Sequence, residues 1–441
     1  MRLKLQEQLP FVFQSVEHRR ADELRRIDTT LQQLERDFLG DVYQDLTGHL
    51  QRPTEGRNGL SADTTIRALL YLRMFQLSYR DLEFTLRDSV SARQFCRIEG
   101  RGPSRTALHR AIKRVSPETL ERINQLLLRL CVDEGIEDGE VIAIDATVME
   151  ADIAAPTDSK LLRDVICSGA RLLSRVAARV GFSFVNHSRL AKRRHLAAHH
   201  SRRKVQRVPH YRKLIWAARR TLKWLKHASS LLDTRSLALH DQIGRLRSVG
   251  HRVVSQAARR VLADESVTAN EKVLSLHAPH VDIIIKDNRK TYFGHKLFAA
   301  KAQRSGLIVD MLLVRGNPAD STVAIPSVVR SARVFDAIPK SVAMDGGFAS
   351  KQNLTTLKTF GIQNVCFSKR RGISVEEMTE DPKTYHKLRN FRSTIEASFS
   401  WLKGSFGLAK CNWRSFDSYH AYAWAAVLSH NLTVLARAGP A

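Results

Sequence analysis

The sequence predicts a mixed α/β protein: a mixed five-stranded sheet with flanking helices, an N-terminal all-α region, and a helical insertion after the first strand. Three observations lead to this prediction. In residues 63–132, apolar residues recur at helical spacing. Residues 141–149 and 281–367 contain short apolar runs that are typical of buried strands. Between these two sets, residues 161–276 again show helical spacing, so the insertion separates the first strand from the others.

Composition limits the class of protein. The 441 residues are enough for about two to four domains, and 43% hydrophobic with 26% charged residues is typical of a globular chain. The 71 Lys and Arg outnumber 44 Asp and Glu, so the formal net charge of +27 favours a polyanionic partner. Nucleic acid is the leading candidate and an anionic membrane surface the second. No apolar run reaches the roughly 18 residues that span a bilayer.

Targeting and cysteine patterns point to the cytoplasm. Residues 1–20 are mixed and charged, without the apolar core of a signal peptide. The five cysteines are widely spaced and form no C-x-x-C motif, so neither a disulfide framework nor a zinc knuckle is expected.

The N-terminal region is predicted to contain a DNA-binding helical unit. Residues 51–59 break any helix, and Asp63 is a candidate N-cap for the helix that follows. A second helix is expected over residues 79–87, and a third begins after the candidate cap Ser104. Basic residues of this third helix include Arg105, Arg110 and Lys113. Two helices and a basic third one suggest a helix-turn-helix unit, although small basic bundles without DNA contact are equally common.

The strongest compositional signal is an acid-free segment, residues 165–232, which holds 17 Lys and Arg. Four of these cations are Arg193, Arg194, Arg202 and Arg203. A solvated helix usually mixes charge signs for i,i+4 pairing. The unrelieved repulsion therefore favours contact with DNA phosphates over a merely solvated surface. The histidines at 195, 199 and 200 have no Cys or carboxylate beside them and extend this basic surface. Helical patterning continues to about residue 276.

After Pro279 the apolar spacing becomes strand-like. The expected strands cover residues 281–285, 296–300, 307–314, 341–345 and 362–367. Helices are expected over residues 323–329, 350–360 and 418–436, and also around the segment 389–403. A basic loop, residues 369–372, follows the last strand.

Two of the expected strands each carry a single carboxylate. Asp145 follows four apolar residues in the first strand, and Asp345 ends the strand that begins at Ser341. With the insertion removed, the order of elements is ribonuclease H-like, and in that order the first and fourth strands are neighbours. Asp145 and Asp345 would then be adjacent, and Glu396 would lie on a helix beside the strand ends. For Asp145 alone, a hydrogen bond to neighbouring backbone remains the simpler interpretation.

Three converging carboxylates need a cation. A pair about 4 Å apart costs about 4 kcal/mol at an effective dielectric of roughly 20. Oxygen ligands in an open site select Mg²⁺ or Mn²⁺. Two such ions suit an in-line displacement at phosphorus, because one activates the attacking oxygen and the other stabilises the leaving oxygen.

The residues around the carboxylates resemble the DDE transposases of bacterial insertion sequences. Asp145-Ala146-Thr147 resembles the first motif, and Asp345-Gly346-Gly347-Phe348 resembles the D-x-G-[FY] second motif. The third motif, R-x3-E-x6-K, is matched by Arg392, Glu396 and Lys403. The full family signature begins with a tyrosine three positions before that arginine. This sequence has Arg389 there, and its nearest tyrosine is Tyr385.

The resemblance covers residues 60–415 and implies a function. Asp145, Asp345 and Glu396 would be the catalytic carboxylates and the ligands of two Mg²⁺ or Mn²⁺ ions. Arg392, Lys403 and the neighbouring Arg389 would hold DNA. The enzyme would cleave the repeats at the element's ends and join them to target DNA, as a homo-oligomer that is dimeric in the complex and associated with the bacterial nucleoid.

Two other functions remain open from the sequence: a metal-dependent nuclease of the same fold, and a non-catalytic DNA-binding protein from a decayed element. The expected division of the chain has four parts. It consists of a helical DNA-binding region (1–132), a catalytic domain (139–160 and 277–415), a basic insertion (161–276) and a C-terminal helix (416–441).

Overall fold

The computed structural model describes residues 17–51, 59–233, 236–286 and 290–438. The chain divides into two compact units, one formed by residues 1–150 with 296–441 and the other by residues 151–295. The predicted break over residues 51–59 falls almost wholly outside the described residues, as do the first 16 residues of the predicted N-terminal region.

The N-terminal part of the first unit is helical, as predicted. Its helices are α1 (Arg19–Thr47), α2 (Ala62–Met74), α3 (Tyr79–Asp88), α4 (Val90–Phe95), α5 (Arg105–Ile112) and α6 (Pro117–Asp133). Serine side chains accept hydrogen bonds from the first turns of α2 to α6, which satisfies backbone donors that a helix leaves free. Helix α4, capped by Ser89, was not predicted.

The predicted cap Asp63 has another role, because Ser61 caps α2. Asp63 is buried and pairs with Arg67, with 2.5 Å between Oδ1 and Nε. Arg67 also pairs with Asp28 of α1, which in turn accepts a hydrogen bond from Arg97 over 2.9 Å. Removing one member of such a network would leave a buried charge without compensation, so these ion pairs fix α1 on α2.

The sheet of the structure has seven strands. They are β1 (Val141–Ala151), β2 (Asp282–Lys286), β3 (Lys290–Ala302), β4 (Ile308–Val314), β5 (Ser341–Met344), β6 (Asn364–Phe367) and β7 (Lys410–Cys411). The order is β2-β3-β1-β5-β6, with β4 on β3 and β7 on β1. The predicted number of five is wrong for two reasons. The long strand β3 pairs with β2 over its first half and with β4 over its second half, and β7 adds a two-residue strand.

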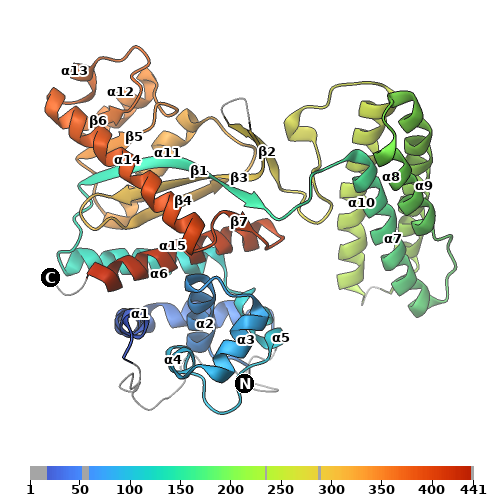
Figure 1. Ribbon diagram of the computed structural model, residues 1–441, viewed down its shortest axis with the longest axis horizontal. Helices are drawn as coiled ribbons and strands as arrows, with labels where there is room; N and C mark the ends of the chain where they lie inside the picture. Colours follow the sequence, from blue (N-terminus) through green and yellow to red (C-terminus); the bar gives the residue numbers. More distant parts are fainter. Residues whose placement is uncertain (1–16, 52–58, 234–235, 287–289, 439–441) are drawn as a thin grey trace. The chain divides into compact units, whose positions relative to one another are not determined.

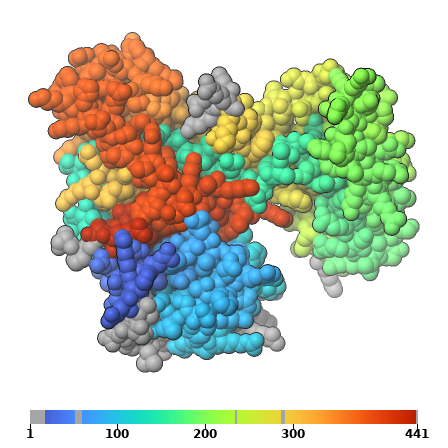
Figure 2. Space-filling model, viewed as in Figure 1, coloured from blue at the N-terminus to red at the C-terminus, as the bar shows by residue number. Residues whose placement is uncertain are grey.

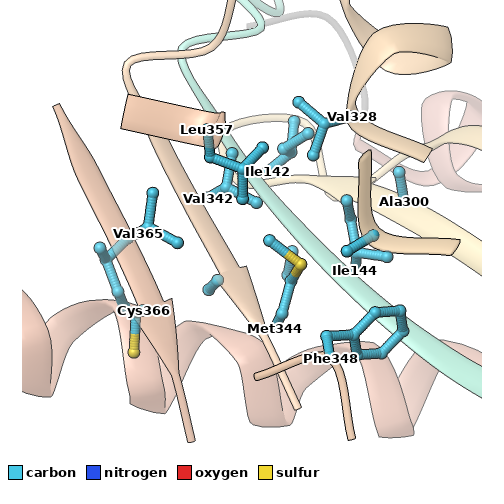
Figure 3. Close-up of a cluster of buried hydrophobic side chains, with 14 of the residues drawn as sticks. Ile142, Ile144, Ala300, Val328, Val342, Met344, Phe348, Leu357, Val365 and Cys366 are labelled. Atoms are coloured by element: carbon cyan, nitrogen blue, oxygen red, sulfur yellow. The ribbon is translucent and has the colours of Figure 1, made fainter. Parts of the chain in front are cut away.

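Strands β1, β5 and β6 are parallel and form the buried centre of the sheet. Every residue of β5 and β6 is buried, as expected for parallel strands covered on both faces. Figure 3 shows Ile142, Val342 and Val365 from the three strands in one cluster, with Met344 near Phe348.

Helices α11 (Asp320–Phe335), α12 (Lys351–Thr359), α13 (Val375–Met378), α14 (Pro382–Ser405) and α15 (Phe416–Ala438) complete the first unit. Helix α14 packs on β5 and β6, whereas α11 packs on β4. Helix α15 contacts α1, α2 and α6; in Figure 2 the red C-terminal segment lies against the blue N-terminal one. None of the helices in the described ranges is long and apolar enough to cross a membrane.

The second unit contains the four helices of the predicted insertion: α7 (Asp158–Val180), α8 (Ser188–His200), α9 (Lys204–Ser230) and α10 (Leu237–Ala257). Their apolar faces share one core. The helices approach closely at Gly169, where a Cβ would lie 2.3 Å from Thr221 Cγ2. The prediction of helix to residue 276 is wrong. Regular helix ends with a π-helical turn at Leu262, and Asp264 follows with a φ of 58°.

Candidate active site

The parallel register brings the two aspartates together. Ile144 of β1 is paired with Met344 of β5, and Met344 is paired with Phe367 of β6. The next residues along the chain are Asp145 within β1, Asp345 just after β5 and Ser368 just after β6, so they follow one another across this end of the parallel strands. The strand spacing in a sheet is about 4.8 Å, so Asp145 and Asp345 are neighbours although 200 positions separate them in the chain.

Helix α14 adds the third carboxylate and a cation. Asp381 caps the helix and Pro382 begins it, and Arg392 and Glu396 follow at i and i+4 on one face. Arg392 Nη1 lies 3.0 Å from Asp145 Oδ2 and 3.7 Å from Asp345 Oδ1. Its Nη2 lies 3.0 Å from Glu396 Oε1. One guanidinium thus joins all three carboxylates that the motifs indicated.

The two aspartates have different environments. The side chain of Asp145 is 13% exposed and that of Asp345 is 40% exposed. Burial raises the pKa of Asp145 to about 6, although the backbone N–H of Ala146 and the charge of Arg392 act in the other direction. Burial also acts to raise the pKa of Asp345. Hydrogen bonds from Ser368 and from the backbone of Gly346 outweigh it, so that this pKa is lowered.

The raised pKa of Asp145 predicts a pH dependence of the metal-free protein. Folding favours the protonated carboxyl, so this contribution to stability is complete below the ordinary pKa of 3.8 and is lost as the pH rises through about 6. In EDTA, the free energy of unfolding of wild type should fall by about 2–3 kcal/mol between pH 4 and pH 7, relative to that of Asp145→Asn. Denaturant unfolding of both proteins at the two pH values measures this. Equal pH dependence in the two proteins would contradict it.

The donor set fits a hard divalent cation. Within the described ranges, no three His, Cys, Asp or Glu side chains are already arranged to hold a metal ion. The reason is visible in the geometry: the guanidinium of Arg392 lies among the three carboxylates. Its Nε is buried and has no hydrogen-bond partner there. The three carboxylates therefore already surround one positive charge, the guanidinium of Arg392. Their oxygen atoms are also the ligands that Mg²⁺ and Mn²⁺ prefer.

Other residues of α14 have distinct positions. Arg389 is exposed, and Lys403 is half-buried in the last turn. Tyr385 is buried, and its hydroxyl donates to the carbonyl of Phe367 over 3.1 Å, so it ties α14 to β6. Sequence reasoning placed Arg392 on DNA phosphates and did not find Ser368. Pairing the two strands in register would have placed Ser368 beside Asp345.

The predicted DNA-binding residues outside α14 are mostly on the surface. Arg105 and Arg110 of α5 are exposed, but Lys113 is turned inward. Its Nζ lies 3.6 Å from the ring centre of Trp413 and has no hydrogen-bond partner in the described ranges. Burial lowers the pKa of Lys113 to about 7, so this side chain does not present a fixed charge to DNA.

In the insertion, nearly all the cations of the acid-free segment are exposed. Arg193, Arg202 and Arg203 point their charges to solvent, whereas Arg194 is half-buried and lies 3.3 Å from His210 Nδ1. The apolar faces of the same helices form the core, so the bundle is folded in spite of its unbalanced charge.

Comparison with known protein families gives two matches. The family described as "Transposase DDE domain" matches residues 275–432, which include Asp345, Arg392 and Glu396. The family described as "Transposase domain (DUF772)" matches residues 13–114. No curated protein and no solved structure matches the chain significantly.

Proposed function

Because the chain is a DDE-type transposase of the insertion-sequence kind, we propose that Asp145, Asp345 and Glu396 are its catalytic carboxylates. The enzyme cleaves DNA and transfers strands. The observation that supports this assignment best is the convergence of the three side chains on Arg392, from two strands and one helix. Incubation of the purified protein with DNA that carries the native ends of the element tests the function, because both cleaved and joined products can be resolved on a gel.

We further propose that the catalytic domain is ribonuclease H-like. Setting aside β2 and β7, the strand order is β4-β3-β1-β5-β6. Strands β3 and β4 are antiparallel, and β1, β5 and β6 are parallel. This arrangement supports a catalytic domain of residues 139–160 and 277–415 that is interrupted by the insertion, 161–276. Residues 1–132 would form the DNA-binding region and 416–441 the C-terminal helix.

Transposases of this family use divalent metal ions. We propose two Mg²⁺ or Mn²⁺ ions, held by Asp145, Asp345 and Glu396. When bound, they would activate the attacking oxygen and stabilise the leaving oxygen at phosphorus. The chain's own residues prepare the site. The hydrogen bond from Ser368 favours the ionised carboxylate of Asp345, and Arg392 pairs with all three carboxylates.

The DNA substrate would contact several basic surfaces. We propose Arg105 and Arg110 of α5, Arg389 and Lys403 of α14, and the cations of the insertion for this role. A dimer in the complex would hold two element ends at once. Contacts to phosphates supply affinity without sequence information, so the basic insertion would act mainly through charge.

The insertion allows a direct test of this charge. Replacing Arg193, Arg202 and Arg203 together by alanine should weaken DNA binding and flatten its salt dependence. The slope of the logarithm of the binding constant against the logarithm of the salt concentration (the log–log slope) should change by roughly 0.9 for each phosphate contact that is lost. Fluorescence anisotropy with end DNA at several salt concentrations measures the slope. Arg245→Ala on α10 is the control, because that exposed arginine already pairs with Asp241 over 3.2 Å. A slope that matches wild type in the triple variant would exclude these contacts.

A further inference from the structure

Ser368 directly follows β6, as Asp345 directly follows β5, and the last paired residues of these strands are Met344 and Phe367. The Oγ of Ser368 donates to Asp345 Oδ1 over 2.7 Å. The same Oγ accepts from the backbone N–H of Gly346 over 3.1 Å. The backbone N–H of Ser368 donates to the carbonyl of Met344 over 2.9 Å. These three bonds fix the start of the loop after β6 relative to the catalytic carboxylate.

Lys369 follows directly and lies over Gly346. A Cβ added to Gly346 would be 2.4 Å from Lys369 Cβ, 3.0 Å from its Cγ and 3.2 Å from its Cδ. The stem of the lysine therefore crosses the backbone immediately after Asp345. This close approach explains a glycine at position 346, whose φ does not require one.

Lys369 is exposed, and within the described ranges its amine forms no hydrogen bond or ion pair. Its charge nevertheless acts on Asp345, because it contributes to the lowered pKa of that carboxyl. The carboxylates are already compensated by Arg392 at shorter range. Arg370 and Arg371 follow, both exposed, in a turn closed by a 3.0 Å hydrogen bond from the N–H of Ile373 to the carbonyl of Arg370.

We propose that Lys369, anchored by Ser368, is a positioning residue that binds a backbone phosphate of the DNA strand being cut, next to the phosphate at Asp345. This inference rests on the proposed catalytic role of Asp345. A lysine amine is a compact point charge that suits a phosphate oxygen. Strand β5 lies between β1 and β6. Lys369, which follows β6, is therefore on the side of Asp345 that is opposite to Asp145. The ligand is the phosphate backbone, so the contact is independent of sequence.

Lys369→Ala tests the proposal in the full-length protein, with duplex DNA that carries an element end as the probe. The log–log salt slope of binding should fall in magnitude by roughly 0.9, so between 50 and 200 mM salt the variant should lose about threefold less affinity than wild type. In single-turnover cleavage with Mn²⁺, the DNA concentration for half-maximal rate should rise, and Lys369→Arg should largely restore it.

Lys351→Ala is the matched control, because Lys351 is an exposed lysine at the start of α12 in the same unit. It should keep the wild-type slope. A slope in Lys369→Ala equal to that of this control would overturn the proposal. The slope is measured without metal and without cleavage, so this result is distinguishable from failure of the catalytic assignment, which would appear as cleavage by carboxylate variants. The stabilisation by Mn²⁺ should not fall in Lys369→Ala, because removal of a positive charge does not weaken a site for a cation. Its loss would show that Lys369 supports the folded shape of the site, and it would overturn the proposal.

Discussion

Replacing Glu396 by glutamine should abolish metal-dependent cleavage of element-end DNA and leave the affinity for that DNA within a few fold of wild type. The substitution keeps the shape of the side chain and removes its charge, so the site loses one of the three carboxylates that we propose as metal ligands. Loss of an essential metal ligand should reduce the rate by several orders of magnitude, since each factor of ten corresponds to about 1.4 kcal/mol of activation free energy. Affinity should persist because the proposed DNA contacts are made by basic side chains and not by Glu396.

The measurement combines a cleavage assay in Mg²⁺ with anisotropy on the same DNA. Glu380→Gln serves as the control: it removes one exposed carboxylate from the same unit, just before α14. It should cleave at the wild-type rate. Cleavage by Glu396→Gln at that rate would remove Glu396 from the metal site. Loss of DNA binding in the same variant would instead indicate a role of Glu396 in folding or in DNA contact.

The parts of the candidate site could be proposed from the sequence because they depend on local patterns. The apolar run before Asp345 correctly predicts a buried strand, but β5 ends at Met344, so Asp345 is the first residue after the strand and not its last. The i,i+4 spacing puts Arg392 and Glu396 on one helical face. The sequence predicted a polar N-cap for α2 but placed it at the wrong residue, Asp63 and not Ser61. Both side chains can accept a hydrogen bond from a backbone N–H of the first turn. The choice between them depends on Arg67 and Asp28, which no local pattern connects.

What the sequence could not predict depends on tertiary contacts. Spacing on α14 allows Arg392 to face either DNA or the aspartates, and only the distance from α14 to β1 decides between them. Lys113 has the sequence context of a surface cation, yet Trp413, 300 positions later, covers its amine. The strand count differed because β3 is long enough to pair with two strands, and strand length is weakly encoded by alternation alone.

The position of Arg392 changes the expected behaviour of the metal-free site. Three carboxylates repel one another, and a fold tolerates them only beside a cation. Here the guanidinium supplies that charge, with 3.0 Å contacts to Asp145 and Glu396. The side chain of Arg392 is only 16% exposed, so these contacts are partly shielded from water. The arginine and a divalent ion would compensate the same oxygen atoms, and the two should therefore compete.

Arg392→Gln should consequently destabilise the metal-free protein and increase its response to metal. In EDTA, the variant leaves Asp145 without its cation, and loss of one partner of a buried pair costs about 3 kcal/mol. In millimolar Mn²⁺, the variant should gain more stability than wild type gains, because no guanidinium has to leave the carboxylates and the ion binds only the folded state. Melting curves in EDTA and in Mn²⁺ measure both effects. Arg389→Gln is the control, since it removes an exposed arginine one turn earlier on α14. An Mn²⁺ response in Arg392→Gln no larger than in wild type would show that Arg392 supports metal binding and does not compete with it.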